Sequence, residues 1–99
     1  MLRIECRHIV VRKASVCGVV ERDKACLALG RAVRELRAAQ GVSQEELAAR
    51  SGVHRTYMGG IERGERNPSW SKVLLLADGL GVSAAELVAL AERHLGAPA

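Results

Sequence analysis

Residues 41–67 read GVSQEELAARSGVHRTYMGGIERGERN and contain the start and stop signals of two successive helices. Ser43 is followed three residues later by Glu46, with an apolar residue on either side of the pair, which is a capping box with a hydrophobic staple. This arrangement predicts a helix start at Ser43. Gly52 predicts the end of the same helix, since glycine readily takes the left-handed conformation that follows a helix.

Residues 52–54 alone join this helix to the next one, which runs toward Gly64. A short turn containing glycine sets two helices at the wide angle of a helix-turn-helix. At about 100° per residue the second helix has two different faces. One face is small or cationic and holds Arg55, Thr56, Gly59, Gly60 and Arg63. The other packs inward and holds Tyr57, Met58, Ile61 and Glu62.

The cationic face departs from local helix preferences. Arg55 lies in the first turn, where the helix dipole disfavours a cation by roughly 0.3–1 kcal/mol, and His54 is a poor residue for the cap. Gly59 and Gly60 each cost about 1 kcal/mol relative to alanine. A guanidinium at the start of a helix can bind guanine O6 and N7 in a major groove, and paired glycines let the backbone approach DNA closely. The alternative is a solvated surface helix of low stability.

Apolar stripes and glycine stops predict three further helices outside this stretch. The first runs from Cys26 to Gln40, and another begins at Trp70, which is expected in the core. A second capping box at Ser83 opens the last helix, whose inward residues are Leu87, Leu90 and Ala91. The sequence therefore predicts an all-α five-helix bundle over residues 25–96, with residues 97–99 as a tail.

Residues 1–24 do not share this pattern and are predicted to form a separate N-terminal arm. Two short β-branched runs suggest a hairpin around residues 12–15. Because an isolated hairpin is marginal in water, the arm packs on a partner, pairs across a dimer or is disordered. The sequence does not choose among these, and the domain would stand without the arm, which leaves the start codon open.

Length, charge and cysteine usage limit the class of protein. The 99 residues suit one domain, and the net charge of +4 favours a polyanionic partner. Apolar runs are far shorter than the ~20 residues of a membrane span, and no secretory signal is recognised, so we expect a cytoplasmic protein without membrane contact. No nucleophile arrangement or phosphate loop is present, so no enzyme activity is expected.

The cysteines are an odd number, so free thiols are expected rather than disulfides. Cys6, His8, Cys17 and Cys26 could supply four zinc ligands, but no Cys-x-x-Cys pair occurs, and we expect neither a metal site nor a cofactor. A thiol that senses metal or redox state is the remaining alternative to inert cysteines.

Residues 29–90 resemble the Xre/Cro/C1 family of helix-turn-helix DNA-binding domains. The resemblance rests on the motifs RELR at 34–37, GVSQEELA at 41–48, IERG at 61–64, RNPS at 66–69 and LGV at 80–82. Within the family, residues 54–57 and 60–67 look most like controller proteins of restriction-modification systems. The resemblance implies a lambda-repressor-like bundle and a transcriptional regulator that binds a near-palindromic operator as a dimer.

The family's contact positions fall on specific residues of this chain. The resemblance implies phosphate contacts from Ser43 and Gln44, at a helix start that suits anions in any case. It implies base contacts from Arg55, Thr56 and Gly60, although a glycine has no side chain to read a base. The family positions that contact the DNA backbone or groove edges correspond to Tyr57, Arg63, Arg66 and Asn67. The alternatives to a DNA contact are core packing for Tyr57 and simple surface exposure for Gln44.

The resemblance also implies a structural ion pair between Arg37 and Glu62. Val88 and Leu95 lie off the inward stripe of the last helix and are the candidate dimer contacts. Such a dimer would place two recognition helices about 34 Å apart. A competing interpretation is an antitoxin-like or adaptor module that binds another protein through residues 1–24, with DNA binding secondary. The operator, the regulated genes and the sign of regulation are not encoded in these patterns.

Overall fold

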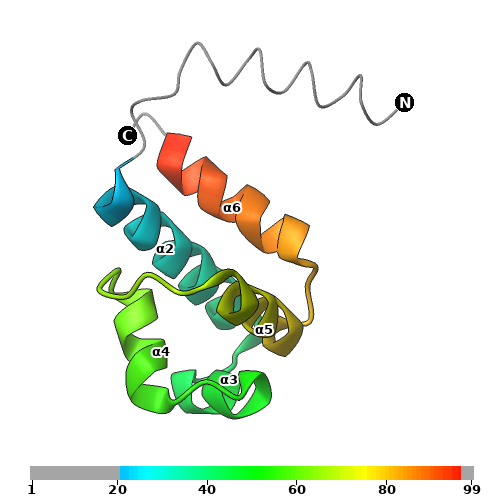
Figure 1. Ribbon diagram of the computed structural model, residues 1–99. Helices are drawn as coiled ribbons and strands as arrows, with labels where there is room; N and C mark the ends of the chain where they lie inside the picture. The colour runs from blue at the N-terminus through cyan, green and yellow to red at the C-terminus, as the bar shows by residue number, and fades with distance from the viewer. Residues whose placement is uncertain (1–20, 97–99) are drawn as a thin grey trace.

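The computed structural model describes residues 21–96, which form five α-helices and no strand (Figure 1). In chain order the helices are α2 (Arg22–Gln40), α3 (Gln44–Ser51), α4 (Arg55–Glu62), α5 (Trp70–Leu80) and α6 (Ala84–Gly96). The predicted all-α five-helix bundle is confirmed. Residues 1–20 and 97–99 lie outside the described residues, and with them most of the predicted arm, the predicted tail, Cys6, His8 and Cys17.

The first helix begins earlier than predicted. α2 starts at Arg22, so the helix has about one more turn at its N-terminal end than the predicted helix from Cys26. The sequence pattern missed this turn because residues 22–24 are all charged and extend no apolar stripe. Asp23 lies in this first turn, where a carboxylate interacts favourably with the helix dipole.

Both predicted capping boxes begin helices, in two different ways. At α6 the box is complete, because the Glu86 carboxylate accepts from the Ser83 backbone N–H at 2.8 Å while Ser83 Oγ accepts from the Glu86 N–H at 3.0 Å. At α3 only the second bond is made, from the Glu46 N–H to Ser43 Oγ at 3.0 Å. The Glu46 carboxylate instead accepts from Arg50 at 3.1 Å.

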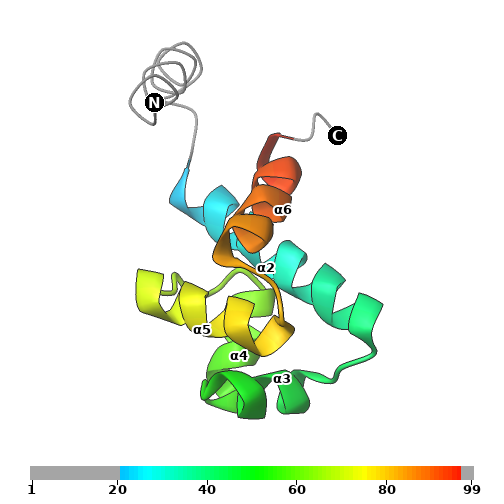
Figure 2. The same cartoon turned by 90° about the vertical axis from the view of Figure 1, so that its right-hand side faces the viewer.

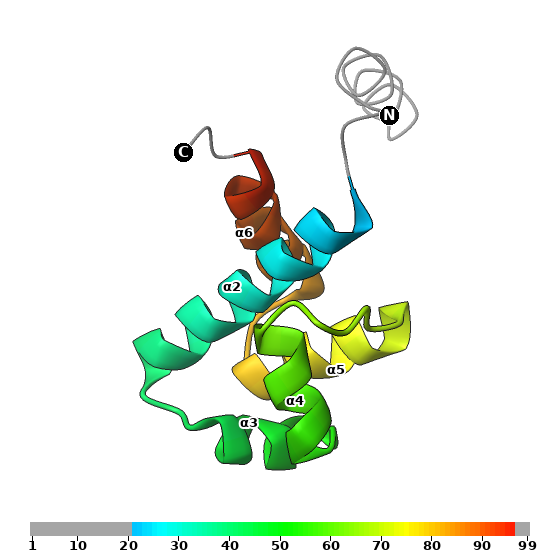
Figure 3. The ribbon, with the colours of Figure 1, turned by 90° about the vertical axis from the view of Figure 1, so that its left-hand side faces the viewer.

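A small aliphatic core lies between the helices. Its fully buried side chains come from α2, α3, α4, α5 and α6 and include Val33, Leu47, Met58, Ile61, Leu76, Leu80 and Leu87. α2 lies along α6 and also packs against α4, while α3 packs against α4 and α5. Figure 2 and Figure 3 show α3 and α4 together at the end of the molecule opposite α6. Leu90 and Ala91 are partly buried against the core, as predicted.

Gly30 allows α2 and α4 to approach closely. A Cβ atom at Gly30 would lie 2.7 Å from the backbone oxygen of Glu62, which is closer than real Cβ contacts. Since that backbone is held within the α4 end, the only side chain that fits here is a hydrogen. The contact fixes the C-terminal end of α4 against the longest helix of the bundle.

One core prediction was wrong. Trp70 is 62% exposed, and Leu74, four residues further along the same helix, is 43% exposed. The buried face of α5 contains Val73, Leu76 and Leu80. Trp70, the first residue of the helix, lies at the margin of that face.

Among residues 21–96 no single helix is long and apolar enough to cross a membrane. Only α5 and α6 taken together match a span in length and composition, and that pair is bent by 103°.

Candidate nucleic-acid interface

The turn between α3 and α4 has the compact geometry expected from its sequence. Gly52 takes a left-handed φ of 73°, and the Val53 backbone N–H donates to the Ala48 carbonyl at 3.1 Å. The Val53 side chain is buried at 5% exposure. The turn is therefore anchored in the core, and the angle between α3 and α4 is fixed from inside the bundle.

Arg37 and Glu62 form the ion pair that the family resemblance implies. Arg37 Nε donates to Glu62 Oε2 at 2.7 Å, and its Nη2 donates to Oε1 at 2.9 Å. The third nitrogen, Nη1, donates to the Val42 carbonyl at 3.0 Å. The hydrogen bond to Glu62 raises the pKa of Arg37, although partial burial opposes the shift.

Gln44 joins this network from α3. Its Nε2 donates to Glu62 Oε1 at 2.9 Å, so the Glu62 carboxylate, whose side chain is 3% exposed, has partners on both α2 and α3. A buried carboxylate without such partners would be strongly destabilising. The network ties the last residue of α4 to two other helices and leaves the outer face of α4 open to solvent.

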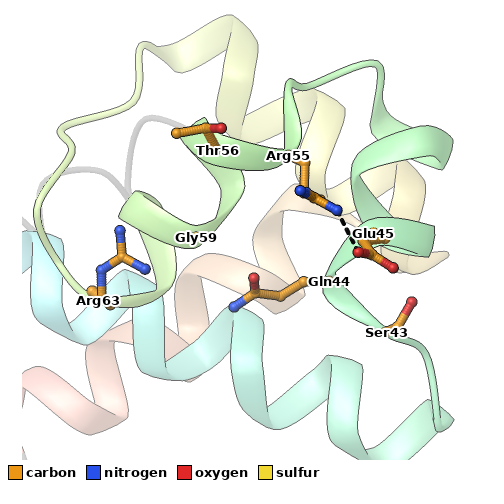
Figure 4. Close-up of a pocket in the computed structure, with 7 residues that line it drawn as sticks. All are labelled: Ser43, Gln44, Glu45, Arg55, Thr56, Gly59 and Arg63. Atoms are coloured by element: carbon orange, nitrogen blue, oxygen red, sulfur yellow. Dashed lines mark hydrogen bonds and ion pairs between the residues drawn. The ribbon is translucent and has the colours of Figure 1, made fainter.

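The outer face of α4 and the start of α3 surround an open hollow of about 480 Å³. Figure 4 shows the residues that line it, which are Ser43, Gln44, Glu45, Arg55, Thr56, Gly59 and Arg63. Six of these seven are predicted DNA-contact residues, which the fold brings together from two helices. The exception, Glu45, was not predicted as a site residue.

Glu45 forms an ion pair with Arg55. Arg55 Nη1 donates to Glu45 Oε2 at 2.5 Å, between side chains that are 66% and 65% exposed. A carboxylate therefore compensates the cation in the first turn of α4. Sequence reasoning missed the pair, because it joins residues ten apart across the turn and depends on the angle between the two helices.

His54 caps α4 despite its poor statistical preference for that position. Its Nδ1 accepts from the Thr56 backbone N–H at 3.1 Å. Histidine is statistically disfavoured at this position, but a ring nitrogen can accept a backbone N–H as a serine oxygen does. The start of α4 is thus held rigidly beside Arg55 and Thr56.

The two glycines of α4 are buried beneath arginine side chains. A Cβ at Gly59 would lie 3.1 Å from Arg63 Nη1, and one at Gly60 would lie 2.7 Å from Arg66 Cγ. Gly59 and Gly60 therefore let Arg63 and Arg66 lie flat across α4. This gives the glycines a packing reason that the sequence pattern did not show.

Tyr57 fits both of its predicted roles, core packing and part of the surface that is predicted to contact DNA. The ring is half-buried against the core, and it has Arg66 at 5.4 Å and Lys72 at 5.6 Å from its centroid. A cation over an aromatic face is attracted by the ring quadrupole. Lys72, on α5, is a further cation of this surface that sequence reasoning missed.

Two other predicted contact residues are exposed at the C-terminal end of α4 and in the loop after it. Arg63 Nε donates to Glu65 at 3.0 Å, and this hydrogen bond raises the pKa of Arg63 and lowers that of Glu65. Asn67 is exposed in the loop between α4 and α5.

Comparison with known proteins identifies the family. Residues 28–90, more than half of the 99-residue chain, match the family described as a helix-turn-helix domain. This chain belongs to that family. The match covers all of α3, α4 and α5, so the surface described above is part of the helix-turn-helix domain.

Three similar proteins are control or controller proteins, and two of them are named as restriction-modification controllers, as the sequence resemblance indicated. The control protein C.SmaI of Serratia marcescens is 46% identical over 56 residues, 57% of this chain and 67% of that protein. The controller C.AhdI from Aeromonas hydrophila is 48% identical with a TM-score of 0.61 and covers 63% of this chain and 94% of its own. Both proteins are named as controllers.

The third similar protein is the controller protein C.Esp1396I, whose structure was solved as a tetramer in complex with its natural 35 base-pair operator. It is 30% identical to this helix-turn-helix chain with a TM-score of 0.68, and the match covers 72% of this chain and 93% of that one. The predicted resemblance to controller proteins is therefore confirmed.

The candidate dimer residues of the helix-turn-helix domain lie on α6. Val88 is 36% exposed. Leu95 is half-buried and lines a shallow hollow between α2 and α6 with Leu27, Arg31 and His94. The nearby His94 Nε2 lies 2.8 Å from the Glu35 carboxylate on α2. Leu95 thus packs in part against its own chain, whereas Val88 faces solvent.

Over residues 21–96 no group of three His, Cys, Asp or Glu side chains could hold a metal ion. Of the four zinc-ligand candidates, Cys26 alone lies in this range, where it is a buried free thiol.

Proposed function

We propose that this protein is a sequence-specific transcriptional regulator that inserts α4 into the major groove of double-stranded DNA. The observation that carries the proposal is the exposed row formed by Arg55 and Thr56 in the first turn of α4 and by Arg63 at its C-terminal cap, while the opposite face of the helix is fixed in the core. A helix presented in this way fits the major groove, which is wide enough to admit it. The similar C.Esp1396I was solved in complex with its operator, which supports operator binding by this protein.

The proposed roles follow from position. Arg55 and Thr56, in the first turn of α4, contact base edges. Ser43 and Gln44 contact phosphate, since the backbone N–H groups at a helix start have no partner within the helix. The side chains of Tyr57, Arg63, Arg66 and Asn67 contact backbone or groove edges, and Gly59 and Gly60 keep the surface of α4 low enough for close approach.

We further propose that the regulator binds a near-palindromic operator as a homodimer through α6, with Val88 at the contact. Two copies related by a two-fold axis would present their α4 helices to successive major grooves, about 34 Å apart. Sedimentation analysis of the purified chain tests this. Dimers that dissociate on Val88→Asp support the proposal, while a wild-type monomer at micromolar concentration, with and without DNA, refutes it.

The proposed DNA-binding unit is the helical part of the chain, and the proposed site of action is the cytoplasm. The role closest to the similar proteins is that of a restriction-modification controller.

A DNA titration tests the proposed function. The duplex enriched by this protein from a randomised library is compared with a random duplex of equal length at two salt concentrations. We expect nanomolar, salt-sensitive binding to the enriched duplex, at least 1,000-fold tighter than to the random one, in the range of specific regulators (~10³–10⁷). Equal, weak binding to both duplexes would refute sequence-specific regulation and favour the protein-interaction module.

A further inference from the structure

Glu45 is an acidic residue within a surface proposed to face DNA. It lines the same hollow as Arg55 and Arg63, and Figure 4 shows its carboxylate turned toward Arg55 across the turn. A carboxylate here repels phosphate and weakens attraction to every DNA sequence. Its presence is explained if it contributes more to recognition of one sequence than it costs in overall attraction.

The geometry of the pair leaves one edge of Arg55 available. Glu45 binds Nη1 of Arg55, and within residues 21–96 the Nε and Nη2 atoms of Arg55 have no protein partner. The same edge of Arg37 shows what it can do, since Nε and Nη2 of that side chain bind the two oxygens of Glu62 at 2.7 and 2.9 Å. Guanine presents two acceptors in a similar arrangement, O6 and N7.

The backbone position of Glu45 is fixed independently of Arg55. It lies in the first turn of α3, where the helix dipole favours a carboxylate. α3 is fixed by its Ser43 cap and by the bond from Gln44 to Glu62. The exposed Glu45 carboxylate is therefore attached to a fixed stretch of backbone, from which it reaches the longer arginine side chain.

We infer that Glu45 is a specificity-determining residue that positions Arg55, holding Nη1 so that the Nε and Nη2 edge faces guanine. The Glu45 carboxylate weakens the attraction of Arg55 to phosphate. It also restricts the rotamers of Arg55 in the free protein, so less side-chain entropy is lost when Arg55 binds guanine. Both effects favour the operator over random DNA. This inference rests on the proposed function.

The test compares Glu45→Ala with Glu46→Ala. Glu46 is the matched control, because it lies in the same turn of α3 and carries the same charge, but its carboxylate pairs with Arg50. The Ser43 cap uses only the Glu46 backbone N–H and remains in both variants. Affinities for the library-enriched duplex and for the random duplex are measured, and circular dichroism confirms that each variant is folded.

We expect Glu45→Ala to lower the ratio of the two affinities about 2- to 10-fold, the effect of freeing one ordered side chain. Glu46→Ala changes both affinities alike and leaves the ratio unchanged. Glu45→Gln, which restores an acceptor oxygen without the charge, recovers part of the ratio. In an Arg55→Ala background Glu45→Ala has no further effect on the ratio, because the residue it positions is absent.

Two results would overturn the inference alone: an unchanged ratio in Glu45→Ala, which leaves only general repulsion of DNA, or an equal loss of ratio with and without Arg55. A wild-type protein that shows no preference for the enriched duplex would instead refute the proposed function, and the inference with it.

Discussion

Replacing Arg37 by alanine should be the most damaging single change among the polar residues that hold α4 in place. The variant leaves the Glu62 carboxylate, 3% exposed, with Gln44 as its remaining partner. Breaking a buried ion pair by removing one partner typically costs about 3–5 kcal/mol. Because Arg37 is itself 18% exposed and Gln44 still donates at 2.9 Å, we expect a cost at or just below the lower end of this range, about 2–3 kcal/mol.

A double-mutant cycle in urea separates the ion pair from simple loss of packing. The free energy of unfolding is measured for the wild type, Arg37→Ala, Glu62→Gln and the double variant. Glu62→Gln should cost less than Arg37→Ala, since the charge it leaves without a carboxylate, on Arg37, is more exposed than Glu62 and still donates to the Val42 carbonyl. The double variant should cost less than the sum of the two. Additive effects, or a cost below about 1 kcal/mol for Arg37→Ala, would refute the reasoning, because exposed pairs contribute no more than that.

Other predictions concern recognition, packing and titration. Arg55→Ala should cost about 1–3 kcal/mol of operator affinity and relax the preference at one base pair, while Arg66→Ala weakens binding to all sequences evenly; equal losses on specific and random duplexes for Arg55→Ala would contradict its role as a base reader. Gly30→Ala should destabilise the fold by about 1–3 kcal/mol, measured by urea unfolding, and an unchanged midpoint would show that α2 and α4 can move apart freely. By NMR the Glu65 carboxyl should titrate below its usual pKa of about 4.3, because it accepts a hydrogen bond from Arg63. The small stabilisation from this bond is therefore present at neutral pH and lost as the pH falls through the lowered pKa. Arg63→Gln should move the pKa of Glu65 back toward the usual value.

Helix starts and stops were predictable because their signals are local. Ser43, Ser83 and Gly52 act through neighbours within a few residues, and the structure confirms a helix boundary at each. The inward faces of α4 and α6 were also predictable, since 3.6-residue periodicity alone decides them.

Contacts between elements were not predictable in the same way. The pair of Glu45 with Arg55 and the approach of Lys72 to Tyr57 depend on how helices cross, which no local pattern states. Trp70 was predicted in the core because it begins an apolar stripe. It is exposed, because whether such a residue is covered depends on where the neighbouring helices end, which the stripe does not show. The Arg37 and Glu62 pair came from the family resemblance rather than from spacing.

The most direct test of the central claim, that α4 reads bases in the major groove, is dimethyl sulfate footprinting on the library-enriched duplex. The reagent methylates guanine N7, which lies in the major groove. We predict protection of guanines in two clusters about 10 base pairs apart, and loss of protection at one guanine per cluster with Arg55→Ala. Tight binding that leaves every guanine N7 reactive would contradict the account, because the protein would then hold the DNA without α4 in the major groove.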